Sequence, residues 1–359
     1  MKRADPTAGA GATTLELARA SYREIALYAP DRAPCAIDLS DNTNLFGIPP
    51  AARRELVEVA TATVTRYPPL YAQELKRALA RYAKVRESEI TTGCGSDDVL
   101  DSAIRAFAEP GEKIAFPDPT FAMIPIFARM NGLVPVPVPH REDWDIDAEA
   151  MLATRARLFY VCSPNNPTAM TASRGQLERL ISQANGVVII DEAYSEYASD
   201  RWIDLAPRHS RLLVVRTLSK AFGLAGLRIG YAAGPETLVS EVEKSRGPYK
   251  VNALAERAAL AALREDGAWV AQGVATVLEN RAKLVTKLKG LGFSPLPSAA
   301  NFVLFPVVDA ARTTKDLRQR GVAVRPFTGL PRINDALRVS IGPWEMMEAL
   351  LTALKELTR

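Results

Sequence analysis

The side chain with the most evident chemical use in this sequence is a lysine placed among small residues. Lys220 lies in the run Thr217-Leu218-Ser219-Lys220-Ala221-Phe222-Gly223, directly after an apolar segment. Burial lowers the pKa of a lysine, and its neutral amine is then a nucleophile. Arg228 follows eight residues later, where its guanidinium could bind a phosphate together with the hydroxyl groups of Thr217 and Ser219. Considered alone, a lysine in a turn is more often a solvated surface residue.

A second polar cluster combines an amide with a carboxylate. The run Ser163-Pro164-Asn165-Asn166-Pro167-Thr168 is followed by Asp191-Glu192-Ala193-Tyr194, which comes directly after the apolar residues 187–190. A carboxylate at the end of a fully apolar strand needs a partner, because its burial is costly. Considered alone, Asp191 could instead cap a helix, and the Asn-Pro run could be an ordinary turn.

A third cluster, Thr92-Gly93-Cys94-Gly95-Ser96-Asp97-Asp98, is expected between a strand and a helix. The N–H groups at the start of a helix, with the positive end of its dipole, can hold a phosphate. The run is not the dinucleotide-binding fingerprint, because Asp98 stands where that motif needs glycine. Without the other clusters, an ordinary strand–helix turn explains it equally well.

The elements that must position these clusters alternate along the chain. Short β-rich runs are separated by helical patterns from residue 89 onward, which predicts a largely parallel sheet covered by helices. The predicted strands are 90–92, 113–116, 134–138, 157–162, 187–190, 212–216 and 228–232, and later 301–307, 322–325 and 336–341. The predicted helices are 15–27, 49–64, 70–84, 96–107, 121–130, 174–184, 253–291 with possible breaks at Gly267 and Gly273, 313–320 and 344–357.

The pattern of strands predicts an edge strand and the place of a ligand site. Prolines alternate in the run 134–139, which favours an edge strand over a polyproline recognition helix. The carboxyl ends of parallel strands meet at one edge of a sheet, and ligands bind there. We therefore expect the three polar clusters to meet.

Composition narrows the function classes. The net charge of the 359 residues is only +4, which is weak support for nucleic-acid or membrane binding, and no apolar run approaches a membrane span. Two histidines make a histidine triad or a multi-histidine metal site improbable, so no metal is expected. Three cysteines without ligand spacing, and no visible signal peptide, predict a reduced, cytoplasmic setting.

The chain contains an Asn, then the pattern Asp-x-x-Tyr, and then Ser-Lys with an arginine eight residues after the lysine. In this order the residues resemble the active-site motifs of the fold type I aminotransferases that depend on pyridoxal phosphate. Within them the chain most resembles the histidinol-phosphate aminotransferase family, over residues 28–341. The resemblance implies a mainly parallel seven-stranded sheet between helices, with a smaller α+β domain. It also implies transamination of histidinol phosphate with 2-oxoglutarate, in histidine biosynthesis.

The resemblance assigns roles around the cofactor. Lys220 would bind the cofactor aldehyde covalently and then act as the base, Asp191 would pair with the pyridine nitrogen, and Tyr194 and Asn166 would bond the ring oxygen. The residues implied to hold the phosphate are Gly95, Ser96, Asp97, Thr217, Ser219 and Arg228. Phe121 would stack on the ring, where the family usually has tyrosine.

Substrate-side roles follow in the same way. Arg338 would clamp the α-carboxylate, and Arg325, thirteen residues earlier, would help bind the substrate phosphate. Tyr28 and Asn44 resemble residues near the substrate. The chain departs from the family at Thr43 and Leu45, where Glu and Pro are usual, and at Ala169, where Gly is usual. These departures leave a different amino-acid substrate open. For Arg325 and, less so, Arg338, simple surface pairing with acidic neighbours stays an alternative.

The resemblance also bears on organisation. It implies a large cofactor domain over 46–265 and a small domain built from 14–45 and 266–359. Residues 1–13 are small and polar without periodicity, which predicts a disordered tail. Tyr67 resembles a tyrosine that reaches the cofactor phosphate of the other subunit, which implies a homodimer with shared active sites. The partners expected are therefore a second copy and small amino-acid and keto-acid substrates, not nucleic acid or membrane.

Two enzymes of the same fold remain as alternatives, and two non-enzymatic functions are disfavoured. An aromatic or other amino-acid aminotransferase would use the same motifs. A threonine-phosphate decarboxylase-like enzyme shares the scaffold but breaks a different bond to Cα. A non-enzymatic regulator normally carries a DNA-binding domain, and only about 14 small residues precede the first predicted helix. An inactive interaction protein would be expected to lack Lys220 or Asp191.

Overall fold

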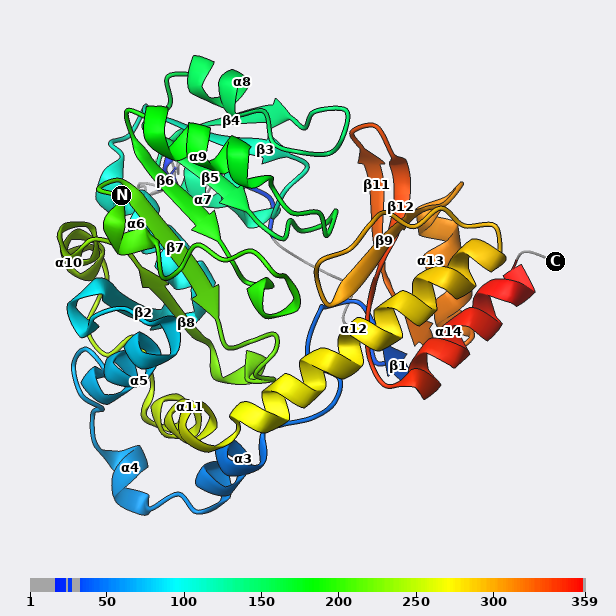
Figure 1. Ribbon diagram of the computed structural model, residues 1–359, viewed down its shortest axis with the longest axis horizontal. Helices are drawn as coiled ribbons and strands as arrows, with labels where there is room; N and C mark the ends of the chain where they lie inside the picture. Colours follow the sequence, from blue (N-terminus) through cyan, green and yellow to red (C-terminus); the bar gives the residue numbers. More distant parts are fainter. Residues whose placement is uncertain (1–16, 24, 28–32, 358–359) are drawn as a thin grey trace, which may run out of the picture.

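The computed structural model describes residues 17–23, 25–27 and 33–357, which form a seven-stranded sheet with its helices beside a smaller body of helices and short sheets (Figure 1). The predicted tail over 1–13 and the predicted site residue Tyr28 lie outside the described residues. Of the helix predicted over 15–27, the described part includes α2 (Ala20–Arg23).

The seven-stranded sheet has the order β2-β8-β7-β6-β5-β3-β4. Only β8 runs antiparallel to its neighbours β7 and β2, so the predicted, mainly parallel sheet is confirmed. Its strands are β2 (Ile90–Cys94), β3 (Lys113–Asp118), β4 (Val134–Pro139), β5 (Leu158–Cys162), β6 (Val187–Asp191), β7 (Leu212–Thr217) and β8 (Ile229–Ala233).

The centre of this sheet is buried on both faces. Every residue of β5, β6 and β7 is buried, and successive side chains of a strand point to opposite faces. Helices must therefore cover both sides, as the continuous apolar run in β6 predicted. The proline-rich strand β4 lies at the end of the sheet and pairs only with β3. This edge position is confirmed, because proline cannot donate to a second neighbour.

The helices of this body connect its strands and pack against them. They are α3 (Pro50–Val57), α4 (Thr61–Thr65), α5 (Gln73–Ala83), α6 (Gly95–Phe107), α7 (Met123–Met130), α8 (Ala148–Ala153), α9 (Arg174–Gln183), α10 (Glu236–Ser245) and α11 (Ala253–Glu265). Short 3-10 turns are η1 (Glu87–Glu89), η2 (Ser195–Tyr197), η3 (Ala206–Arg208) and η4 (Ala225–Leu227). None of the helices in the described part of the chain is long and apolar enough to cross a membrane.

The smaller body follows α11 and is reached by the long helix α12 (Gly267–Gly290), drawn in yellow in Figure 1. A three-stranded antiparallel sheet has the order β11-β12-β9, and a separate short pair joins β1 to β10 in parallel. The remaining elements are β1 (Ile37–Asp38), β9 (Phe302–Pro306), α13 (Ala310–Gln319), β10 (Val322–Ala323), β11 (Arg325–Leu330), β12 (Asn334–Ser340) and α14 (Trp344–Leu357).

Three predicted elements are each divided in two in the structure. The helix predicted over 49–64 is two helices, α3 and α4, and β-branched residues, which are poor helix formers, surround the break at 58–60. The stretch 253–291 breaks at Asp266, next to the predicted Gly267, while Gly273 stays helical. The strand predicted over 322–325 is two strands, because the chain leaves β1 after Ala323 and joins β12 from Arg325 onward.

Candidate active site

The polar clusters meet at one edge of the large sheet. Strands β5, β6 and β7 run parallel, and β2 has the same direction because it is antiparallel to β8. Their carboxyl ends therefore lie together, and β8 begins at that edge directly after Arg228. A cavity of about 750 Å³ opens there, and the β11–β12 hairpin of the smaller body completes its wall.

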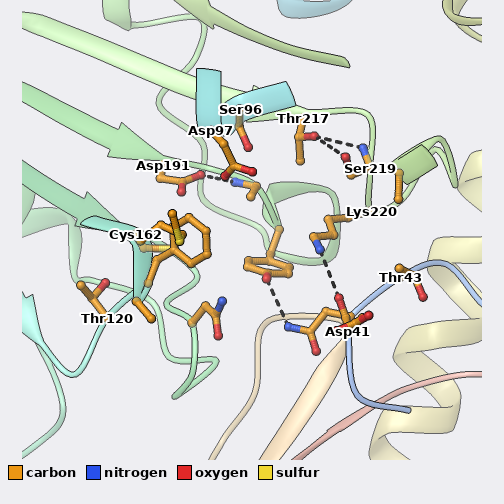
Figure 2. Close-up of a pocket in the computed structure, with 18 of the residues that line it drawn as sticks. Asp41, Thr43, Ser96, Asp97, Thr120, Cys162, Asp191, Thr217, Ser219 and Lys220 are labelled. Carbon is orange, nitrogen blue, oxygen red and sulfur yellow. Dashed lines mark hydrogen bonds between the residues drawn. The ribbon is translucent and has the colours of Figure 1, made fainter. Parts of the chain in front are cut away.

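Most of the residues singled out from the sequence line this cavity, and they are Ser96, Asp97, Phe121, Asn166, Asp191, Tyr194, Thr217, Ser219, Lys220, Arg228, Arg325 and Arg338. Figure 2 shows Ser96, Asp97, Thr217 and Ser219 on one side, Asp41 and Thr43 on the other, and Lys220 between them. The topology thus brings together side chains that lie far apart in the sequence.

Three predicted residues are placed differently. Gly95 lies beside the cavity as the first residue of α6, not in its lining. Asn44 donates to the Ala221 carbonyl at 3.0 Å and accepts from the Phe46 N–H at 2.8 Å, while Thr43 faces the cavity. Tyr67 is 83% exposed and does not line the cavity of its own chain.

An anion cradle forms where α6 meets Arg228. Gly95 has a φ of +82°, and a Cβ there would lie 2.6 Å from the Arg228 guanidinium. Arg228 donates to Asp97 at 2.9 Å, and the Thr217 hydroxyl donates to the Ser219 hydroxyl at 2.8 Å. The first N–H groups of α6 have no intrahelical acceptor and carry the positive end of the helix dipole. This geometry suits a phosphate group.

The carboxylate of Asp191 ends β6 and faces the cavity while only 3% exposed. Its Oδ1 accepts the Ala193 N–H at 3.0 Å, and its Oδ2 accepts the Tyr160 hydroxyl at 2.8 Å. Burial raises the pKa of Asp191 to about 6, although these two hydrogen bonds act to lower it. Asp191 is therefore ionised at neutral pH and available to a cationic ring nitrogen.

Lys220 lies just past β7, and its Nζ donates to the main-chain carbonyl of Asp41 at 3.4 Å. Burial lowers the pKa of this lysine to about 8, and the positive charges of Arg338 and Arg228 lower it further. The ring of Tyr194 lies 5.6 Å from Nζ, measured to its centroid. A larger fraction of Lys220 than of an ordinary lysine is therefore neutral near pH 7, and the neutral amine is the nucleophilic form.

Two arginines face each other across the hairpin that closes the cavity. Arg325 on β11 and Arg338 on β12 are direct partners in the antiparallel pairing. Arg338 is 6% exposed and donates to Asn166 Oδ1 at 2.6 Å and to the Ser40 carbonyl at 2.7 Å. Like charges directly opposite on neighbouring strands repel. The cavity therefore favours anions at this wall, and the carboxylate of Asp41 lies 3.3 Å from Arg325.

Side-chain hydrogen bonds of Asn165 hold the loop that carries Asn166. The Asn165 amide donates to the Pro119 carbonyl at 3.0 Å and to the Thr168 hydroxyl at 2.9 Å, and its oxygen accepts from Thr120 at 2.8 Å. Asn165 is 3% exposed, so these bonds are buried. They fix the direction in which Asn166 points toward Arg338.

Several lining residues were not predicted from the sequence. Asp41, Thr120, Met123, Cys162 and Phe327 face the cavity, and Tyr160 lies behind Asp191. Asp41 was visible in the run Asp41-Asn42-Thr43-Asn44, but its proximity to Arg325 depends on a separation of 284 residues. No local signal could have paired the two.

These residues fit the cofactor that the sequence resemblance implies. Pyridoxal phosphate carries an aldehyde, a pyridine nitrogen and a phosphate, and the cavity offers an amine at Lys220, a carboxylate at Asp191 and the cradle at Arg228. The space that a Cβ at position 95 would fill lies against that guanidinium, so the glycine keeps the cradle open. The chemistry of the donor set thus matches all three groups of the cofactor.

Comparisons with known proteins show which proteins this chain is similar to. The sequence profile of the family described as aminotransferase class I and II matches residues 35–354. The chain is 33% identical to the histidinol-phosphate aminotransferase of Thermoanaerobacter sp. strain X514, covering 95% of this chain and 98% of that protein. It is 39% identical to the histidinol-phosphate aminotransferase of Roseiflexus castenholzii, covering 89% of each.

A solved structure supports the fold. Histidinol-phosphate aminotransferase from Sinorhizobium meliloti, solved in complex with pyridoxal-5′-phosphate, superposes with a TM-score of 0.85. The two chains are 25% identical, and the match covers 98% of this chain and 99% of that one.

Proposed function

Because the chain belongs to the aminotransferase class I and II family, we propose that it exchanges the amino group of histidinol phosphate with 2-oxoglutarate. The products are imidazole-acetol phosphate and glutamate, and the cofactor is pyridoxal phosphate. The single observation that carries this proposal is that the Lys220 amine, the Asp191 carboxylate and the opposed Arg325 and Arg338 line one cavity. The named relatives support the substrate.

The residues divide the work of the reaction. Bound pyridoxal phosphate supplies the aldehyde that takes up the substrate nitrogen and the protonated ring that withdraws electrons from Cα. Asp191, held by Tyr160 and Ala193, would keep the ring nitrogen protonated through its negative charge. Lys220 would act as the base that takes the proton from the substrate Cα and as the acid that returns a proton.

The remaining side chains position the ring and the substrate. Burial raises the pKa of Tyr194 well above the ordinary value, so its hydroxyl keeps its proton, and the hydroxyl oxygen accepts a hydrogen bond from the Asn42 amide at 3.2 Å. Phe121 would stack on the ring, and Asn166 would bond the ring oxygen. Arg338 clamps the α-carboxylate or the corresponding end of the substrate, and Arg325 binds the substrate phosphate.

The oligomer and the domain division belong to the same proposal. Tyr67 stacks on Tyr249 with ring centroids 4.8 Å apart, and Val64 beside it is 67% exposed. An exposed aromatic and aliphatic surface of this kind fits a partner protein, and we assign it to a second copy whose cavity receives Tyr67. Residues 46–265 would form the cofactor domain, and 14–45 with 266–359 the small domain.

A half-reaction screen tests the proposed function. The holoenzyme is mixed with histidinol phosphate alone, and the absorption of the cofactor is followed. We expect conversion to the amino form of the cofactor, and then stoichiometric glutamate when 2-oxoglutarate is added. Phenylalanine, tyrosine and threonine phosphate are the comparison substrates. A response to one of these but none to histidinol phosphate would overturn the substrate. Carbon dioxide released from threonine phosphate without glutamate formation would overturn transamination.

A further inference from the structure

A buried tyrosine outside every motif of the sequence contacts the carboxylate at the centre of the proposed site. Tyr160 is on β5 and has no exposed surface, and its hydroxyl donates to Asp191 Oδ2 at 2.8 Å. In the parallel pairing of β5 with β6, Cys162 is the partner of Asp191, and Tyr160 is the partner of Ile189. Tyr160 thus lies two residues back on the neighbouring strand, on the same face as Asp191.

This contact selects one protonation state of Asp191. An ionised carboxylate only accepts hydrogen bonds, and both of its oxygens are occupied by donors, the Ala193 N–H at 3.0 Å and the Tyr160 hydroxyl. Burial raises the pKa of Tyr160 itself well above its ordinary value, so the hydroxyl keeps its proton and remains a donor. Hydrogen bonds to the charged form favour that form.

The other charged and titratable groups near Asp191 differ in whether they stabilise its ionised form. Lys220, from the segment after β7, favours the ionised carboxylate, while Asp97, from α6, opposes it and is itself bound to Arg228. Cys162 and Tyr194 also face Asp191, and burial raises the pKa of each, so they are neutral. The hydrogen bond from the Tyr160 hydroxyl affects the pKa of Asp191 more than the Ala193 N–H, Asp97 or Lys220 does. Only burial, which raises this pKa, has a larger effect.

We propose that Tyr160 is a positioning residue that holds Asp191 ionised and oriented toward the cofactor ring, and is not simply a core side chain. The proposal rests on the proposed function in one respect, the pairing of Asp191 with the ring nitrogen. Tyr160 does not line the cavity, so its effect on a bound cofactor must pass through Asp191. Removing its hydroxyl should therefore change a titration, whereas removing a merely structural hydroxyl should change stability alone.

The test compares Tyr160→Phe with Tyr197→Phe, which deletes another buried tyrosine hydroxyl. Tyr197 is 5% exposed and is not among the groups that shift the pKa of Asp191. In the cofactor-free protein, the carboxyl infrared band of Asp191 is titrated and assigned by its loss in Asp191→Asn. A hydrogen bond to a charged group contributes about 1.5–3 kcal/mol, so the pKa of Asp191 should rise by about 1–2 in Tyr160→Phe. It should stay unchanged in Tyr197→Phe.

The second readout is the affinity for pyridoxal phosphate as a function of pH. If Asp191 binds the ring nitrogen only when ionised, Tyr160→Phe should bind about 3–25-fold more weakly than the wild type near pH 6.5. The two affinities should converge above pH 9, where Asp191 is ionised in both proteins. Because the protonation of the free cofactor is common to both proteins, it cancels in the ratio.

The experiments distinguish a failure of the role proposed for Tyr160 from a failure of the role proposed for Asp191. An unshifted Asp191 titration in Tyr160→Phe, or an affinity ratio that is constant with pH, overturns the role of Tyr160. If Asp191→Asn binds the cofactor and turns over like the wild type, the proposed function of Asp191 is overturned instead, whatever Tyr160→Phe does. Phenylalanine fills the same core volume as tyrosine apart from the hydroxyl, and thermal unfolding of both variants verifies that they are folded.

Discussion

The carboxylate of Asp41 lies 3.3 Å from the guanidinium of Arg325 at the wall of the cavity, and each side chain is less than one-fifth exposed. The two residues are 284 positions apart and come from opposite ends of the chain. A phosphate on the substrate must displace or share this partner to reach Arg325. Asp41 is therefore expected to govern how strongly the site prefers a phosphorylated substrate.

Replacing Asp41 with asparagine should strengthen the binding of the substrate phosphate, because the competing negative charge is gone. We expect kcat/KM for histidinol phosphate to rise about 3–10-fold, corresponding to about 1 kcal/mol for a partly exposed ion pair. Histidinol without phosphate and glutamate are the control substrates, since Asp41 also raises the pKa of Lys220. Equal changes for all three would show that Asp41 acts on Lys220 and not on the phosphate site.

Replacing Lys220 with alanine should abolish the covalent link to the cofactor. We expect loss of the long-wavelength absorption of the yellow holoenzyme, and a fall in turnover of at least about 10²–10⁴-fold, because the base at Cα is also removed. Lys244→Ala is the control, since this lysine is 68% exposed and pairs with Glu241 on α10. An unchanged absorption spectrum in Lys220→Ala would refute the assignment.

Replacing Gly95 with alanine should damage the anion cradle. The new Cβ would lie 2.6 Å from the Arg228 guanidinium, on a backbone with φ of +82°. Since a charge-assisted hydrogen bond contributes about 1.5–3 kcal/mol, its displacement should weaken pyridoxal phosphate binding at least tenfold. Gly175→Ala in α9 is the matched control, because its Cβ would meet no atom within 4 Å. Fluorescence titration of the cofactor-free proteins measures both, and equal affinities would disprove the cradle.

Asp191 should be a source of instability in the cofactor-free protein. Its pKa rises from 3.8 unfolded to about 6 folded. The folded protein thus binds the proton more tightly, so stability falls as pH rises from about 4 to 6. The full cost of about 3 kcal/mol is present above pH 6. Asp191→Asn should therefore raise the thermal unfolding midpoint at pH 7.5, not at pH 4, while turnover collapses. A rise of the same size at both pH values would contradict this origin.

A shared active site can be tested by mixing two inactive variants. Lys220→Ala removes the nucleophile from a subunit's own cavity, and Tyr67→Ala removes the side chain proposed to enter the neighbouring cavity. Refolding the two together should produce hybrid dimers in which one site has both residues intact, restoring about one quarter of wild-type activity by random pairing. Each variant refolded alone is the control, and neither should recover activity. Absence of recovery in verified hybrids would exclude Tyr67 from the partner's site.

Much of the large sheet could be predicted from the sequence, because its signals are local. The apolar run 187–190 predicted a strand covered on both faces, and alternating prolines placed β4 at the edge. Helix boundaries were less accurate. The break between α3 and α4 lies in an exposed segment where Val57 is 76% exposed, so no buried apolar face extends the helix against its poor propensity.

The cofactor-side residues were predictable because each stands in a short run just after a strand. Lys220, Asp191 and Ser96 follow or end β7, β6 and β2, and a parallel arrangement brings such ends together whatever the remaining fold. The residues on the substrate side were harder to predict from the sequence. Asn44 is turned to the Ala221 backbone while Thr43 faces the cavity, and the sequence run contains no information about which of the two points inward.

The alternation of strands and helices and the chemistry of the residues at the strand ends could be read from the amino-acid sequence, since both depend on neighbours within a few positions. Contacts between side chains of distant segments depend on the folded chain. Tyr160 reaches Asp191 because β5 and β6 pair in one register, and Asp41 reaches Arg325 because the two ends of the chain meet. Hydrogen bonds and ion pairs act over about 3–4 Å, so these contacts exist only once the fold has closed.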